Sequence, residues 1–152
     1  MRSGLLANGL AIISSCGVLS LACSTGPEGD VSGLWDVTET LSSQTGISCN
    51  MTGEILLSQS SNSGDFSGQL ARPVDNIDCT NAPATFENRL SGVHNTLNGK
   101  LSGLGVTFDL VLCQYEGTLA EPAMSGTMEC EEDPNQTGET VIFTGTWQAT
   151  RK

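Results

Sequence analysis

The chain has 152 residues, of which 38% are apolar and 5% aromatic. That length suits one domain of ordinary size, and the apolar content is too high for a wholly disordered chain. Seventeen acidic and six basic residues give a net charge of −11. This balance argues against a nucleic-acid partner, because phosphate binding needs clustered Lys and Arg. Six cysteines and one histidine leave few groups for acid–base chemistry, so we expect no enzymatic activity and no cofactor.

The first 22 residues have the pattern of an export signal. Met1-Arg2-Ser3 is a short basic start, and residues 4–22 carry no charge and are rich in Leu, Ile, Ala, Val and Gly. The segment Leu19-Ser20-Leu21-Ala22-Cys23 then resembles the lipobox of bacterial lipoproteins. The resemblance implies a diacylglycerol on Cys23 and cleavage just before it. The segment ending in Cys16 also matches, but cleavage at Cys23 removes Cys16 and leaves an even number of thiols, as an oxidising compartment favours.

The resemblance also implies a location. Ser24 stands where such lipoproteins use an aspartate for retention at the inner membrane. We therefore expect a lipid-anchored protein of the bacterial cell envelope, at the outer membrane where the cell has one. Residues 23–31 are small and polar, with Gly and Pro, and predict a flexible tether before a domain at 32–152. Ordinary secretion with cleavage elsewhere is the alternative.

From Gly33 onward apolar and polar residues alternate with the period of a half-buried strand, and no window shows convincing helical spacing. Turn signals lie at 63–64, 98–99, 121–122 and 131–138, and Asn98-Gly99 is a strong signal for a two-residue hairpin. Glycines inside the strands suggest a tightly coiled sheet. The pattern predicts an all-β domain, an antiparallel up-and-down barrel of roughly eight strands, with a β-sandwich as the alternative. Residues 73–95 interrupt the alternation.

The four remaining cysteines agree with these hairpins. Directly paired residues of an antiparallel hairpin have a constant index sum, so each pair has its turn at the midpoint. The midpoint of Cys113 and Cys130 falls between residues 121 and 122, and that of Cys49 and Cys79 falls on residue 64. Both positions are predicted turns. We therefore predict disulfides Cys49–Cys79 and Cys113–Cys130, although four cysteines permit three connectivities.

The two ends of the domain resemble those of the calycin barrels, which include the lipocalins, fatty-acid-binding proteins and avidins. Gly33-Leu34-Trp35 opens the first strand, and Gly145-Thr146-Trp147-Gln148-Ala149-Thr150-Arg151 closes the last. In that superfamily a Gly-x-Trp on the first strand packs against a basic residue near the end of the last one. The resemblance implies that Trp35 and Arg151 form the pair that closes the barrel, with the guanidinium stacked on the indole.

Few residues suggest chemistry. Asp133, Asn135 and Thr137 match the first half of an EF-hand calcium loop, but Thr144 stands where the bidentate glutamate belongs. They form only a weak calcium candidate, and we expect no metal site. No Cys-x-x-Cys pair exists, and His94 has no cysteine nearby, which argues against zinc. Nothing places a Ser or Asp against His94 as a nucleophilic site requires.

Two functions are consistent with this pattern. The first is a lipid-anchored barrel whose mouth or interior binds a small apolar or amphipathic ligand, and the scarcity of aromatic residues favours a cavity over a filled core. The second is an envelope lipoprotein with a filled β core, an interaction role and no small-molecule ligand; its protein partner is not indicated. The residues expected to line a cavity are the inward set Val37, Leu41, Ile55, Leu57, Leu70, Phe108, Leu110, Met128 and Phe143.

Overall fold

A computed structural model describes residues 27–60 and 63–152, so the predicted signal, Cys16 and Cys23 lie outside the described residues. The described part forms one antiparallel sheet of nine strands. In chain order the strands are β1 (Gly33–Ser43), β2 (Ser48–Gln59), β3 (Asp65–Arg72), β4 (Ile77–Thr80), β5 (Gly92–Ser102), β6 (Gly105–Leu110), β7 (Cys113–Ala120), β8 (Ala123–Glu132) and β9 (Val141–Arg151).

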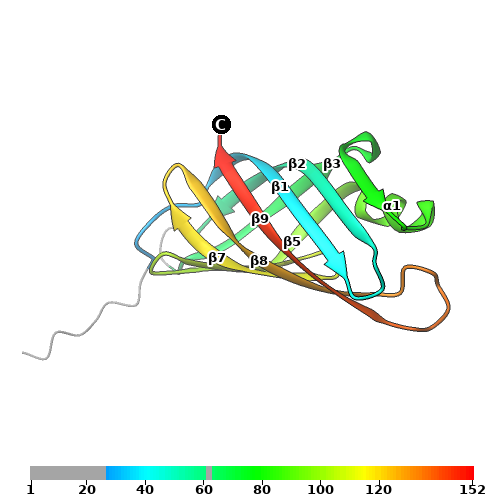
Figure 1. Ribbon diagram of the computed structural model, residues 1–152. Helices are drawn as coiled ribbons and strands as arrows, with labels where there is room; N and C mark the ends of the chain where they lie inside the picture. Colours follow the sequence, from blue (N-terminus) through cyan, green and yellow to red (C-terminus); the bar gives the residue numbers. More distant parts are fainter. Residues whose placement is uncertain (1–26, 61–62) are drawn as a thin grey trace, which may run out of the picture.

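Eight of these strands close into a barrel (Figure 1). The order is β1-β9-β8-β7-β6-β5-β3-β2, and β1 pairs with β2 to complete the ring. Strand β4 lies outside the ring and extends the pairing of β2. The predicted all-β, up-and-down barrel is thus confirmed, and the β-sandwich alternative is wrong because a single closed sheet surrounds the core. This is the architecture that the calycin resemblance implies.

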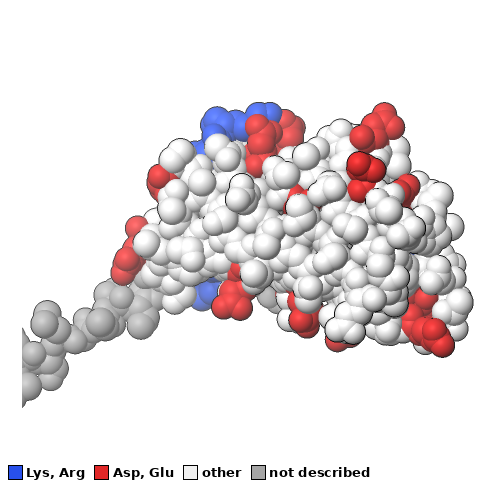
Figure 2. All heavy atoms as spheres, in the orientation of Figure 1, with Lys and Arg blue, Asp and Glu red and all other residues white. Residues whose placement is uncertain are grey.

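Side chains alternate between the core and the solvent along the barrel strands, as the sequence pattern predicts, except in β5, where Leu97 and Asn98 are both exposed. All nine residues of the inward set are buried, none more than 6% exposed. Figure 2 shows acidic side chains dispersed over the outer surface, with the basic ones of this view gathered mainly near the C-terminus. There Lys152 forms ion pairs with Asp36 and Glu54. The described part of the chain contains no helix long and apolar enough to cross a membrane.

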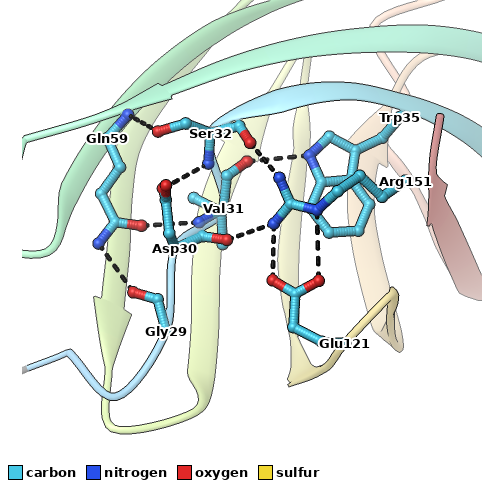
Figure 3. A network of polar contacts seen from close by, with 8 residues as sticks. All are labelled: Gly29, Asp30, Val31, Ser32, Trp35, Gln59, Glu121 and Arg151. Atoms are coloured by element: carbon cyan, nitrogen blue, oxygen red, sulfur yellow. Dashed lines mark hydrogen bonds and ion pairs between the residues drawn. The ribbon is translucent and has the colours of Figure 1, made fainter.

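One end of the barrel is closed by a network around Arg151 (Figure 3). Trp35 and Arg151 are direct cross-strand partners on β1 and β9, and the guanidinium carbon lies 4.3 Å from the centre of the indole. The same guanidinium forms an ion pair with Glu121 at 2.6 Å and donates to the carbonyls of Asp30 and Ser32. Because Glu121 lies in the β7–β8 turn, the network joins the first and last strands to a neighbouring hairpin. We call it the closed-end network.

The closed-end network also holds the segment that precedes β1. The Gln59 side chain accepts a hydrogen bond from the Val31 amide at 2.8 Å and donates to the Gly29 carbonyl at 3.3 Å. Val31 is fully buried, and its carbonyl accepts a hydrogen bond from the Trp35 indole at 2.9 Å. Residues 29–31 of the predicted tether are therefore fixed against the closed end of the barrel (Figure 3).

Two local expectations are corrected. Asn98-Gly99 lies inside β5 rather than in a hairpin turn, and the register of β5 shifts there against both β3 and β6. Asn98 has a φ of 53°, so the positive φ that the dipeptide favours forms a bulge instead of a turn. The region that interrupts the alternation contains a short helix, α1 (Ala84–Leu90), after a 3-10 turn at Val74–Asn76. A helix of seven residues, about two turns, in which only Phe86 and Leu90 are buried is too short to show a clear period.

A candidate ligand pocket at the barrel mouth

The end of the barrel opposite the closed-end network is its mouth. There lie the β1–β2 and β6–β7 turns, the β8–β9 loop and the segment between β3 and β5 that carries α1. Helix α1 buries Phe86 and Leu90. The Phe86 ring stacks on that of Phe143 in β9, with ring centres 5.1 Å apart. Just before α1, the disulfide Cys49–Cys79 joins β4 to β2. The helix is therefore fastened at the mouth by apolar packing and by a covalent link in the strand that precedes it.

The middle of the barrel is filled by side chains. The cavity among them has a volume of only about 10 Å³, and most of the predicted inward set lines it, including Val37, Ile55 and Phe108. A cavity needs about 10–15 Å³ to hold one water molecule. The inward set therefore packs against itself, and the structure offers no room there for a ligand larger than water.

A larger cavity, of about 280 Å³, lies at the mouth beside α1, and we call it the mouth pocket. Its volume is close to the lower end of the range for small-molecule pockets, about 300–1,000 Å³. Leu41 is the one member of the predicted inward set that lines it. The complete lining is Leu41, Phe86, Arg89, Leu90, Val111, Leu112, Cys113, Cys130 and Glu132. Seven of these nine residues are uncharged and apolar.

The β6–β7 turn contributes two apolar residues to the mouth pocket in an unusual way. Val111 has a φ of 58°, which is strained for a β-branched residue, and Leu112 is 56% exposed. A two-residue hairpin turn normally consists of Asn-Gly or a similar pair, which adopts positive φ readily and is compatible with exposure to water. Strain and exposure of this kind concentrate at functional sites. The turn therefore presents apolar side chains to the pocket at the expense of local stability.

The remaining walls of the mouth pocket are a disulfide and an ion pair. The predicted disulfide Cys113–Cys130 is present and joins β7 to β8 at the pocket, as Cys49–Cys79 joins β2 to β4. At the other side Arg89 of α1 pairs with Glu132 at 2.5 Å and donates to the Asp133 carbonyl at 2.8 Å. These groups connect α1 to the end of β8, so the lining is held by covalent and ionic links.

A buried polar cluster lies below α1, and sequence reasoning missed it. Glu39 pairs with Arg72 and accepts a hydrogen bond from the Tyr115 hydroxyl at 3.0 Å, and all three side chains are buried. Arg72 also donates to the Leu90 carbonyl at 3.2 Å, which connects the cluster to α1. A signal was available: each of the three residues lies at an inward position of its strand.

Burial dominates the electrostatics of this cluster. It raises the pKa of Glu39 above its ordinary value of 4.5, more than the Arg72 guanidinium and the Tyr115 hydroxyl lower it. Burial, together with the nearby Glu39 carboxylate, also raises the pKa of Tyr115 well above 10. Tyr115 therefore stays a neutral hydrogen-bond donor, and both Tyr115 and Arg72 donate to the Glu39 carboxylate.

The calcium candidate is not assembled as a cation site. Burial would raise the pKa of Asp133, but backbone N–H groups of the loop lower it below its ordinary value of 3.8, and one carboxylate oxygen accepts from the Gly138 amide at 2.6 Å. The Asp133 carboxylate thus binds the backbone of its own loop. Asn135 and Thr137, the other two calcium candidates, follow it in that loop. Among residues 27–60 and 63–152 no three His, Cys, Asp or Glu side chains are grouped to hold a metal ion. His94 hydrogen-bonds through Nε2 with the Ser91 carbonyl.

A broad hollow on the outside of the barrel differs from the mouth pocket in character. It has a volume of about 1000 Å³ and lies across the outer faces of β1, β9, β8, β7 and β6. Its lining consists mostly of outward hydroxyl, amide and carboxylate side chains, such as Thr127, Gln114 and Glu129. Ligand sites are usually enclosed and predominantly apolar. The mouth pocket therefore fits a small ligand better despite its smaller volume.

Comparisons with known proteins give one weak structural similarity. No protein-family model matches the chain, and no curated protein matches it. Among solved structures, the chain is similar to the S-type phycobiliprotein lyase CPES from Guillardia theta, with 11% identity and a TM-score of 0.32 over 80% of this chain and 88% of that one. That protein is named a lyase, and the prediction that this chain is not an enzyme is withdrawn.

Proposed function

We propose that this protein binds a small apolar or amphipathic molecule in the mouth pocket of its lipocalin-like barrel. The observation that carries the proposal is the strained Val111-Leu112 turn beside a cavity of about 280 Å³ lined mainly by apolar groups. A residue held in a sparsely populated backbone region costs about 1–3 kcal/mol. A turn that served only to connect β6 to β7 would avoid that cost with Asn-Gly. Contact with a ligand gives a reason for Val and Leu at these positions.

A fluorescent apolar probe tests this function. N-phenyl-1-naphthylamine is expected to bind the wild-type protein saturably. Leu112→Ser should weaken its binding about fivefold, because a partly buried leucine contributes roughly 1 kcal/mol of apolar contact. The matched control is Leu104→Ser, since Leu104 is 44% exposed in the β5–β6 turn at the closed end. Unchanged binding in L112S, or an equal loss in L104S, would contradict the proposal.

The filled interior favours the second candidate function, an envelope protein that acts through its surface. A core whose cavity is about 10 Å³ resembles a solid domain rather than a calyx. The same titration separates the two functions. Absence of saturable probe binding to the wild-type protein would support the interaction role and end the ligand proposal.

We also propose that Cys23 carries a lipid anchor and that the protein belongs to the bacterial cell envelope. The support is the lipobox sequence and the fixed position of residues 29–31 at the closed end. Pro27 is four positions after Cys23, and four fully extended residue steps span at most about 14 Å. An anchor at Cys23 would thus hold the closed end near the bilayer and direct the mouth pocket away from it.

Fractionation of the producing cells tests the anchor. Cys23→Ser is expected to move the protein from the membrane fraction to the soluble fraction, because the bound acyl chains contribute about 0.8 kcal/mol of attachment per buried methylene. Cys16→Ser is the control and should leave the protein with the membranes. The opposite pattern would assign the lipid to Cys16, and membrane retention of both variants would refute the anchor.

A further inference from the structure

The mouth pocket exposes almost no polar atom, although two of its lining residues are charged. Arg89 Nη2 forms an ion pair with Glu132 and donates to the Asp133 carbonyl, and Arg89 Nε has almost no accessible surface. The charged groups are thus engaged with each other and with the backbone, and the exposed surface of the pocket is almost wholly apolar. A ligand in the pocket therefore meets almost no group with which it could form a hydrogen bond.

The buried polar cluster below α1 does not supply such a group either. Tyr115 and Arg72 both donate to Glu39, and none of the three side chains belongs to the lining of the mouth pocket. A polar group of a ligand placed in the pocket would lose its hydrogen bonds to water without replacement, which is unfavourable. The pocket therefore disfavours ligands that must bury a carbonyl, a hydroxyl or a charge in it.

The opening of the mouth pocket offers little to the head group of an amphipathic ligand. Leu112, whose side chain is 56% exposed, places an apolar group at the solvent side of the lining. Arg89 and Glu132 are oppositely charged and lie 2.5 Å apart, so the pair presents no net charge. Neither an anionic nor a cationic head group gains a net attraction from it. Of the two kinds of ligand that the proposed function allows, the lining therefore favours the apolar one over the amphipathic one.

The volume of the mouth pocket limits the size of its occupant. A dry cavity of about 150 Å³ lined by Leu, Ile and Phe is large enough to bind benzene. The mouth pocket has a similar lining, which includes Leu41, Leu90 and Phe86, and its volume of about 280 Å³ is nearly twice as large. This volume suits a compact skeleton of about two rings, whereas a long acyl chain would leave much of its length in water.

We infer that the mouth pocket takes a compact hydrocarbon of about two rings that carries neither a charge nor a hydrogen-bonding group, such as a bicyclic aromatic or terpenoid hydrocarbon. The inference rests on the proposed ligand-binding function and names the chemical class of the ligand. Specificity arises because the pocket compensates none of the polar groups that an oxygenated relative of such a ligand would bury.

Three compounds of graded polarity test the ligand class by displacing N-phenyl-1-naphthylamine. They are 2-ethylnaphthalene, the ketone 2-acetylnaphthalene, which has nearly the same shape, and decanoate, an amphipathic chain. The hydrocarbon is expected to bind about tenfold more tightly than the ketone, and decanoate should displace the probe least. Equal or tighter binding of the ketone or of decanoate would overturn the inference and leave the proposed function intact. Absence of saturable probe binding would instead overturn the proposed function.

A pair of matched variants places the hydrocarbon in the mouth pocket. Val111→Thr adds a hydroxyl to the lining with little change of shape, and it should weaken the binding of 2-ethylnaphthalene about fivefold. Val93→Thr is the control, because Val93 is 67% exposed on β5 and lies outside the lining. Unchanged affinity in V111T, or an equal loss in V93T, would overturn the inference. If Val111→Thr fails to fold, the ranking of the three compounds by the wild-type protein decides the matter.

Discussion

Arg72→Met is expected to lower the free energy of unfolding by about 3–5 kcal/mol at pH 7. Glu39 and Arg72 form a buried ion pair inside the barrel, where their side chains are 1% and 2% exposed. The methionine of the variant brings no charge to balance Glu39 and no hydrogen bond to the Leu90 carbonyl. Removing one partner of a buried pair leaves an uncompensated charge in a poorly solvated site, which is strongly destabilising. Urea denaturation monitored by tryptophan fluorescence measures the loss.

Two further variants show whether the charge is the cause. Glu54→Gln removes a carboxylate that pairs with Lys152 on the exposed surface, and it should leave the unfolding transition unchanged. The double variant Glu39→Met with Arg72→Met removes both buried charges at once. It should recover most of the stability lost in Arg72→Met, because an apolar pair often replaces a buried ion pair without penalty. A double variant less stable than Arg72→Met would show that the pair itself stabilises the barrel.

The raised pKa of Glu39 gives the same cluster a pH dependence. Just above pH 4.5 the native protein binds a proton at Glu39 that the unfolded chain does not bind. The contribution of this carboxyl to stability is therefore complete below about pH 4.5 and declines as the pH rises through the native pKa. Arg72, Tyr115 and, at longer range, His94 act on the same group. The wild type should lose stability over this range relative to the double methionine variant, and a constant difference would contradict the shift.

Much of the fold was predictable because it follows from local alternation and turn chemistry. The alternation of apolar and polar residues alone places strand residues such as Trp147 and Phe143 on the inward face. The 121–122 turn and the midpoint of Cys113 and Cys130 independently indicate the same hairpin. The Asn98-Gly99 dipeptide misled because its preference for positive φ serves a bulge as well as a turn. Only the pairing of β5 with two neighbours distinguishes the two, and that is a long-range property.

The candidate site was less predictable because its residues come together through the parts that break the alternation. Arg89 and Phe86 lie on α1, whose position at the mouth depends on contacts with β3, β8 and β9 that no local pattern records. Glu39 was the clearest missed signal, since it lies between Val37 and Leu41 on the inward face of β1. A charged residue at an inward position requires a partner, and Arg72 also lies at an inward position.

Replacing either cystine by a pair of alanines is expected to lower the free energy of unfolding by about 3 kcal/mol, because each disulfide limits the freedom of the unfolded chain. The sequence separations are 17 residues for Cys113–Cys130 and 30 for Cys49–Cys79. The entropy that a disulfide removes from the unfolded chain grows with the logarithm of the length of the loop it closes. Removal of Cys49–Cys79, which closes the longer loop, should therefore cost about 0.5 kcal/mol more. Urea denaturation of the two double variants, C49A/C79A and C113A/C130A, measures both quantities.

Ligand binding should rank the two disulfides in the opposite order. Cys113 and Cys130 form part of the mouth-pocket lining, whereas Cys49 and Cys79 lie outside it. At a temperature where both proteins are folded, C113A/C130A is therefore expected to lose most of its affinity for N-phenyl-1-naphthylamine, because the alanines leave the pocket wider and open to water. C49A/C79A, the less stable protein, should bind the probe nearly as well as the wild type. Equal loss of affinity in both variants would mean that binding follows overall stability, and intact binding in C113A/C130A would place the ligand elsewhere.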